Sequence, residues 1–319
     1  MSLYEHFTSK GPSGFGYGST AEQVTEGLSL DGQTILVTGS NSGLGAETMR
    51  VLALRGAQVI GTARTAEKAK DACDQVTGKT IPVACELSDP ASIHACVETV
   101  KGKGLRLDAI VCNAGIMALP RLEKVHGYEK QFFTNHIGHF MLVTGLLDQL
   151  TDTGRVVMLS STAHKGAPKG AIEFDNLDGA KGYRDFRNYG QSKIANLLFA
   201  TELSRRFAGT KRTANAVHPG VIATNLSRNM NPLVSFVLKV AEPVGLKSVP
   251  QGAATQVYVA TNPGLAGVTG EYFADCNVAK PRSDGRDPEI AKRLWLVSGR
   301  SPLHPSDTRL SSPQPTFAR

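Results

Sequence analysis

The chain has 319 residues, 41% hydrophobic and 20% charged, and this balance is that of a globular protein with a large buried core rather than a disordered chain. Its formal net charge is +7, but the lysines and arginines are scattered, with no run longer than Arg205-Arg206 and Lys211-Arg212. We therefore expect a solvated basic surface, which argues against nucleic-acid binding and would suit an anionic phosphate cofactor.

Residues 1–31 form a segment rich in glycine, serine and threonine ahead of the first predicted strand. This composition predicts a loose N-terminal arm, with a flexible tail as the default expectation. The aromatic residues of the arm, Phe7, Phe15 and Tyr17, could pack on the body of the protein or on a second subunit.

The first strand is predicted over 34–37, and a turn with three glycines and a helix over 46–54 follow it. Gly39 lets the chain turn tightly off the strand, Gly43 lets backbone approach a pyrophosphate, and Gly45 lets the helix pack close to the strand. The start of the helix then offers free N–H groups and a positive dipole end to phosphates. Strand, glycine turn and helix in this order predict a nucleotide-binding unit.

The rest of the chain alternates strands with helices. Further strands are predicted over 57–63, 81–85, 107–112, 155–159, 213–217 and 270–273, and further helices over 65–76, 90–100, 123–150, 188–207, 251–260 and 289–297. This alternation predicts parallel βαβ units in one domain over 32–299, with ligands bound beyond the carboxyl ends of the strands. Pro82 indicates an edge strand, and the proline- and serine-rich residues 300–319 are predicted to be a disordered tail.

The cysteines and the apolar runs indicate where in the cell the protein is expected. The chain has no C-x-x-C pair, so its five cysteines are predicted to be buried thiols in a reducing compartment rather than disulfides or zinc ligands. No apolar run is long enough to span a bilayer, and the first residues lack the pattern of a signal peptide. We expect a cytoplasmic protein without a membrane span.

The candidate catalytic groups fall on one predicted helix and at strand ends. Tyr189 and Lys193 stand at i and i+4, which places a phenol and an ammonium on one helix face. A nearby cation favours the phenolate and lowers the pKa of a tyrosine from about 10, so this pair suits proton transfer to a developing alkoxide. Ser160 and Ser161 follow the fifth strand, and Asn135 lies within the long predicted helix.

These motifs together resemble the classical short-chain dehydrogenase/reductase family. The turn T-G-x-x-x-G-x-G, the triplet Asn113-Ala114-Gly115, the serine pair and the Y-x-x-x-K motif occur in the family's order, over roughly residues 32–295. The resemblance implies a single-domain α/β Rossmann fold with a doubly wound, mostly parallel, seven-stranded sheet and helices on both faces.

The resemblance also implies catalytic roles. Tyr189 would be the general acid/base, and Lys193 would lower its pKa and hold the nicotinamide ribose. Ser161 rather than Ser160 would bond the substrate oxygen, since alternation turns only one of the two toward the site. Asn135 would anchor a water that relays protons to Lys193.

For the cofactor, the resemblance places Ala63 where an acid selects NAD(H), and Arg64 follows it. A guanidinium can hold a 2′-phosphate, which favours NADP(H) over NAD(H), and Lys68 could assist. Thr224 would bond the carboxamide, and Glu86 stands where the family has aspartate. The residues implied to bind the cofactor are Gly39, Ser40, Asn41, Ser42, Gly43, Leu44, Gly45, Arg64, Glu86, Leu87, Asn113, Ala114, Gly115, Tyr189, Lys193, Pro219, Gly220 and Thr224.

Within the family, four segments are similar to the retinol dehydrogenase-like and WW-domain oxidoreductase-like branch, which also holds a chloroplast import-associated dehydrogenase. They are Asn135 to Phe140, Ser160 to His164, His218 to Gly220 and Ala291 to Trp295. A substrate lid over 221–250 would cover an apolar pocket. A core helix over the same residues is about equally consistent with the periodicity. We expect a bulky hydrophobic ketone, aldehyde or secondary alcohol as substrate, and a possible homodimer or homotetramer.

Other interpretations stay open at this point. One is a redox-sensing regulatory protein that binds NADPH and a partner with little turnover, and another is a protochlorophyllide-type reductase. The intact set of Tyr189, Lys193, Ser161 and Asn135 favours an enzyme. Structural roles rather than metal binding are expected for the histidines, because no cluster has metal-ligand spacing: His136, His139, His164 and His218.

Overall fold

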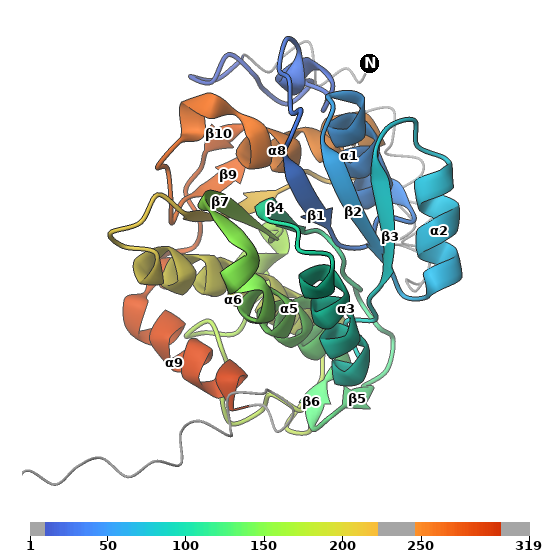
Figure 1. The fold of residues 1–319 in the computed structure, drawn as a ribbon. Helices are drawn as coiled ribbons and strands as arrows, with labels where there is room; N and C mark the ends of the chain where they lie inside the picture. Colours follow the sequence, from blue (N-terminus) through green and yellow to red (C-terminus); the bar gives the residue numbers. More distant parts are fainter. Residues whose placement is uncertain (1–9, 223–245, 301–319) are drawn as a thin grey trace, which may run out of the picture.

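The computed structural model of the chain describes residues 10–222 and 246–300. Its main sheet has eight strands in the order β10-β9-β8-β7-β4-β1-β2-β3 (Figure 1). These are β1 Thr34–Val37, β2 Gln58–Ala63, β3 Thr80–Ala84, β4 Leu107–Cys112, β7 Leu150–Leu159, β8 Thr213–His218, β9 Tyr272–Ala274 and β10 Asn277–Val278. A separate hairpin consists of β5 Lys124–Val125 and β6 Tyr128–Glu129.

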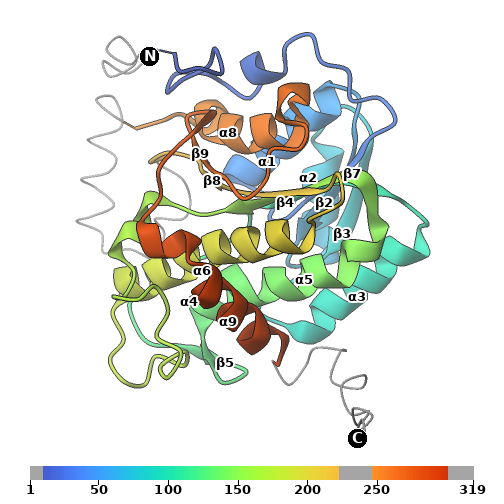
Figure 2. The same ribbon diagram turned by 90° about the vertical axis from the view of Figure 1, so that its left-hand side faces the viewer.

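Helices cover both faces of this sheet (Figure 2). The helices are α1 Gly43–Leu54, α2 Ala66–Asp74, α3 Pro90–Gly102, α4 Lys130–Phe132, α5 Gly138–Leu146, α6 Asp185–Arg206, α8 Val249–Thr261 and α9 Pro288–Gly299. Helices α1 and α8 lie on one face, whereas α3, α5 and α6 lie on the other with α9 outside them. Each face has its own hydrophobic core, and every residue of the central strand β1 is buried between the two.

The doubly wound, mostly parallel α/β Rossmann fold is confirmed, but the sheet has eight strands rather than seven. The additional strand β10 pairs antiparallel with β9 through the two-residue turn Asp275-Cys276, where both residues have positive φ, 51° and 62°. A two-residue strand carries no periodicity in the sequence, which is why it was not predicted. Strand β3, which contains Pro82, lies at the edge as expected.

The prediction of a loose arm is wrong for residues 10–31, which pack on the body. The ring of Phe15 contacts the ring of Tyr258 on α8 with centroids 5.7 Å apart. The amide of Ala21 donates to the carbonyl of Pro250 (2.9 Å), and Ala21 and Val24 are buried. The few apolar residues of the arm are therefore enough to attach it to α8. Residues 1–9 lie outside the described residues.

The prediction of a single helix over 123–150 is also wrong at both ends. Its first part is the β5–β6 hairpin, whose turn residues His126 and Gly127 have positive φ of 50° and 82°, the conformation of a tight hairpin turn. The helical stretch begins at α4, where the Glu129 carboxylate accepts from the amides of Gln131 and Phe132 (2.9 Å each). At the other end, Leu150 already belongs to β7, five residues before the predicted start of that strand.

Candidate active site

The glycines of the turn between β1 and α1 lie where a side chain would be strained or would clash. Gly39 and Gly43 have positive φ, 69° and 54°. A β-carbon on Gly45 would lie 2.2 Å from the Gly39 carbonyl oxygen and 2.5 Å from Nδ2 of Asn113. Only glycine fits there, so the main chain itself forms the surface that a phosphate would approach.

The turn is tied to the end of β4. The side-chain amide of Asn113 donates to the carbonyl of Thr38 (2.8 Å), and the main-chain amide of Ala114 donates to Oγ1 of Thr38 (2.9 Å). Gln256 on α8 donates to Oδ1 of Asn113 (3.2 Å). The sequence predicted Asn113 and Ala114 but missed the Thr38 hydroxyl, whose only signal is its place next to Gly39.

The other predicted residues of the turn face different ways. The hydroxyl of Ser40 donates back to the carbonyl of Val37 (2.8 Å), and the Leu44 side chain packs against Gly252 of α8. Asn41 is exposed, while Ser42 is the half-buried residue that precedes α1. Asn41 therefore presents an exposed polar side chain at the turn.

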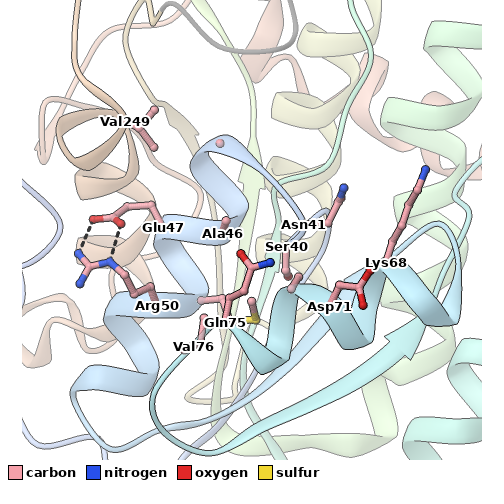
Figure 3. Close-up of a pocket in the computed structure, with 13 residues that line it drawn as sticks. Ser40, Asn41, Ala46, Glu47, Arg50, Lys68, Asp71, Gln75, Val76 and Val249 are labelled. Carbon is pink, nitrogen blue, oxygen red and sulfur yellow. Dashed lines mark hydrogen bonds and ion pairs between the residues drawn. The ribbon is translucent and has the colours of Figure 1, made fainter.

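A pocket of about 520 Å³ lies beside the turn, between α1 and α2 (Figure 3). The ion pair of Glu47 and Arg50 on α1 lies at one end, and Lys68 and Asp71 on α2 lie at the other. None of the predicted catalytic residues lines this pocket. The pocket therefore adjoins the outer side of the turn rather than the catalytic group.

Arg64 follows the buried end of β2, where Ala63 stands in place of an acid. Its side chain is exposed, and it has no bonded partner within residues 10–222 and 246–300. A solvated guanidinium at this strand end is available to an anion.

Tyr189 and Lys193 are almost fully buried on α6. The ammonium of Lys193 lies 5.6 Å from the centroid of the Tyr189 ring and donates to the carbonyl of Leu159 (3.2 Å). Burial lowers the pKa of Lys193 to about 8. The i, i+4 spacing thus brings the two groups together at the carboxyl end of β7.

The pKa of Tyr189 differs from the expectation. Burial raises it to about 12, although a hydrogen bond with Ser161 lowers it in part. The sequence led us to expect a lowered pKa. The difference arises because burial disfavours the phenolate.

The two serines after β7 face opposite ways. The hydroxyl of Ser160 is buried and donates to the carbonyl of Lys193 (2.8 Å). Ser161 is half-buried, its hydroxyl accepts from the amide of Ala163 (3.2 Å), and it bonds Tyr189. Ser161 is thus the serine that lies next to the Tyr189 phenol.

Asn135 lies in a π-helical turn, Phe133–Ile137, between α4 and α5. Its Oδ1 accepts from the amide of Ile116 (2.8 Å), and its Nδ2 donates to the carbonyl of Ile116 and to Oγ of Ser192 (2.9 Å each). A β-carbon on Gly115 would lie 3.2 Å from Oδ1 of Asn135 and 3.4 Å from Nζ of Lys193. Asn135 and Lys193 therefore converge at the end of β4.

The remaining predicted cofactor-binding residues follow β3 and β8. The Glu86 carboxylate accepts from the amide and the hydroxyl of Ser88 (3.0 and 2.8 Å), and Leu87 is buried. Gly220 after Pro219 has φ +96°, and a β-carbon there would lie 2.5 Å from Cδ of Lys247. Thr224 lies outside the described residues, as does most of the predicted lid over 221–250.

Lys247 was missed by the sequence reasoning. Its side chain is buried, pairs with the carboxylate of Asp275 (2.5 Å) and lies 4.9 Å from the Tyr17 ring centroid. Its amide donates to the carbonyl of Val221 (2.9 Å). No sequence signal marks it, because its partners come from the arm and from the β9–β10 hairpin.

The histidines form hydrogen bonds within the protein. His164 bonds the Ser161 carbonyl (2.5 Å) and accepts from the amide of Arg282 (3.1 Å), and His218 accepts from the amide of Thr162 (3.3 Å). His136 bonds Ser298 on α9 (2.9 Å). No group of three or more histidine, cysteine or acidic side chains among the described residues could hold a metal ion.

The cysteines are buried and unpaired, as predicted, and burial raises the pKa of the Cys112 thiol. Within residues 10–222 and 246–300, no helix has the length and apolar character needed to cross a membrane.

Solved structures resemble this one over most of its length. An uncharacterized protein from Mycobacterium paratuberculosis superimposes with a TM-score of 0.71 at 32% identity, over 87% of this chain and 96% of that chain. A blue fluorescent protein from a metagenomic library, solved in complex with NADPH, gives a TM-score of 0.62 at 25% identity, over 77% and 96%.

Sequence relatives cover the chain almost end to end. The chain is 40% identical to short-chain dehydrogenase TIC 32 B, chloroplastic, of Brassica napus, over 93% of this chain and 98% of that protein. Identity is 38% to retinol dehydrogenase 12 of Mus musculus (86% and 87% covered) and 36% to WW domain-containing oxidoreductase of Pongo abelii (88% and 71%). The family model of the short chain dehydrogenases matches residues 33–234. The chain therefore belongs to the short-chain dehydrogenase/reductase family of oxidoreductases, in the branch of the retinol dehydrogenases and the WW domain-containing oxidoreductase.

Proposed function

We propose that this protein transfers a hydride between NADP(H) and the carbonyl or alcohol carbon of a bulky hydrophobic ketone, aldehyde or secondary alcohol. The observation that carries the proposal is the meeting of Tyr189, Lys193, Ser161 and Asn135 at adjoining strand ends, next to a glycine turn that has no room for a β-carbon. A phenol, an ammonium and a hydroxyl in one buried group have the chemistry for proton transfer to a substrate oxygen.

The described residues fit a nicotinamide dinucleotide. Gly39 and Gly45 leave bare backbone at the start of α1, and Gly115 leaves the same opening beside Lys193. When bound, the nicotinamide supplies or accepts the hydride. The preference for NADP(H) rests on Arg64, which has no bonded partner among the described residues, on the absence of an acid at Ala63, and on a similar structure that holds NADPH.

In the direction of reduction, the phenol of Tyr189 donates its proton to the substrate oxygen, and in oxidation the phenolate removes it. A pKa raised by burial to about 12 keeps the phenol protonated and ready to donate at neutral pH. Ser161 holds the substrate oxygen beside the phenol, and the Lys193 ammonium stabilises the phenolate that remains. The phenolate would recover its proton by way of Lys193, and a water beside Asn135 would return a proton to Lys193.

The relatives support the proposed substrate class. Retinol dehydrogenase 12 is named for retinol, a bulky hydrophobic alcohol, and this chain matches it over most of both lengths. The predicted homodimer or homotetramer stays a prediction. So does the cytoplasmic location, since the relatives include a chloroplastic protein.

The test is the oxidation of NADPH, and separately of NADH, by the purified protein with a panel of hydrophobic carbonyls, alongside Tyr189→Phe. We expect turnover with NADPH that disappears in the variant. Tight NADPH binding without turnover on any carbonyl would favour a redox-sensing protein instead. Equal or better activity on small charged 2-oxo acids would contradict the hydrophobic substrate class.

A further inference from the structure

The ring of His139, on α5, lies completely buried between the ends of β1 and β4 and the π-helical turn that holds Asn135. One ring nitrogen, Nε2, is 2.9 Å from Oγ1 of Thr38, and the other, Nδ1, is 2.9 Å from the main-chain carbonyl oxygen of Asn135. The same Thr38 oxygen accepts from the amide of Ala114 (2.9 Å). His139 therefore bridges the cofactor turn and a residue of the proposed catalytic group.

The chemistry of these partners fixes the position of every proton in the bridge. The Asn135 carbonyl can only accept a hydrogen bond, so Nδ1 of His139 must carry a hydrogen. Burial, helped by the charge of Lys193, lowers the pKa of His139 to about 4, so the ring is neutral at neutral pH and Nε2 carries none. The Thr38 hydroxyl must then donate to Nε2 while it accepts from Ala114.

The His139 imidazole bonds the main chain at an irregular point of the helix. In a π-helical turn the main-chain bonds run from i+5 to i, as the bond from the Gly138 amide to the Phe133 carbonyl shows. The imidazole of His139 bonds the Asn135 carbonyl from within the same turn of chain. The side chain of Asn135 is meanwhile held by Ile116 and Ser192.

We propose that His139 is a positioning residue, which fixes Asn135 relative to the glycine turn through the Thr38 hydroxyl. The inference rests on the proposed function, because Asn135 is assigned its role there. As a consequence, the Thr38 hydroxyl positions two groups. One is the Ala114 main chain beside the cofactor turn, and the other is Asn135 opposite Lys193. A residue that merely filled the core would have no such consequence.

His136 provides a matched control on the same stretch of chain. It is also completely buried, and burial lowers its pKa to about 3. Its Nε2, however, bonds Oγ of Ser298 on α9 (2.9 Å) rather than Thr38, and its ring packs against Phe132 and Phe199. Loss of His136 should therefore affect folding without the specific effect on Asn135.

The experiment compares His139→Leu, His139→Gln and His136→Leu with the wild-type protein in NADPH-dependent turnover. We expect kcat to fall about tenfold or more in His139→Leu while the KM for NADPH changes less than about threefold. Glutamine offers an NH2 donor group and a carbonyl acceptor, so His139→Gln should recover part of the loss. His136→Leu should keep its kcat within about twofold. Equal losses of kcat in both leucine variants would overturn the proposal.

Two further readouts need no turnover, so they separate this proposal from the proposed function. Nitrogen-15 NMR of the imidazole should show the Nδ1–H tautomer of His139, and the Nε2–H tautomer would overturn the bridge. Hydrogen exchange of the Ile116 amide, which donates to Asn135, should quicken about tenfold in His139→Leu and not in His136→Leu. Should the wild-type protein turn over no carbonyl, the proposed function fails, while these two readouts still decide the role of His139.

Discussion

The buried hydroxyl of Ser160 donates to the main-chain carbonyl of Lys193 at 2.8 Å, and this bond joins the end of β7 to the middle of α6. Because side chains alternate along an extended chain, the same bond directs Ser161 the other way, toward Tyr189. Ser160 thus holds α6 against the end of β7, whereas Ser161 is available for the proposed chemistry.

Alanine substitutions at the two serines should separate these tasks. Ser161→Ala should lower kcat about a hundredfold, because it removes the hydroxyl that bonds the substrate oxygen, with little change in the free energy of unfolding. Ser160→Ala should lower the free energy of unfolding by about 1–3 kcal/mol, because the Lys193 carbonyl loses its buried donor, and should leave kcat within about threefold. Steady-state turnover and urea unfolding measure the two effects. The reverse assignment, with Ser160→Ala the less active variant, would contradict the geometry.

Replacement of Arg64 should alter the choice of cofactor. In Arg64→Gln the KM for NADPH should rise about tenfold or more, since a charge-assisted bond to a phosphate is lost, while the KM for NADH should change less than about twofold. A suitable control is Lys103→Gln, which removes an exposed charge where α3 ends, before the start of β4. Parallel changes for both cofactors would show that Arg64 acts on the fold rather than on a 2′-phosphate.

Acid should destabilise the protein through its buried histidines. Burial lowers the pKa values of His136, His139 and His218 to about 3, 4 and 4. The unfolded chain takes up these protons near pH 6.5 and the folded chain does not, so stability is lost as the pH falls from about 6.5 toward 4. Each histidine contributes about 1.4 kcal/mol per pH unit in that window.

Urea unfolding at pH 7, 6 and 5 measures this slope, and His136→Leu isolates the contribution of one histidine. The variant should show a slope smaller by about one proton than the wild-type protein. A free energy of unfolding that stays constant from pH 7 to pH 5 in the wild-type protein would contradict the burial of these rings as neutral groups.

The ion pair between Lys247 and Asp275 should matter most when only one partner is removed. Asp275→Asn tolerates the positive φ of 51° at that position but leaves the buried ammonium without a counter-charge. It should cost about 2 kcal/mol of stability, less than the full cost of breaking a buried pair because Asp275 is partly exposed. The double variant Lys247→Met with Asp275→Asn should recover most of the loss, since methionine keeps an apolar stem over Gly220. A double variant less stable than Asp275→Asn would contradict this account.

The local motifs were predictable because their signals are local. The glycine turn needs three glycines within seven residues, and Tyr189 and Lys193 share a face of any helix that contains them. The hairpin at His126-Gly127 was missed because a helix-like apolar pattern on both sides of it outweighed two turn residues. The packed arm was missed for the opposite reason, because its few apolar residues stand in a glycine-rich composition typical of loose chain.

The sequence by itself determined the family, the alternation of the longer strands and helices, and the residue types of the candidate site, since spacing along the chain carries these. Only the tertiary structure decided what each side chain bonds. Thr38 lies about a hundred residues from Asn135 and His139, yet the three form one bridge because two strand ends and a helix meet there. Burial cannot be read from a local sequence pattern. It keeps the His139 ring neutral. It also raises the pKa of Tyr189, which the neighbouring lysine alone would have lowered.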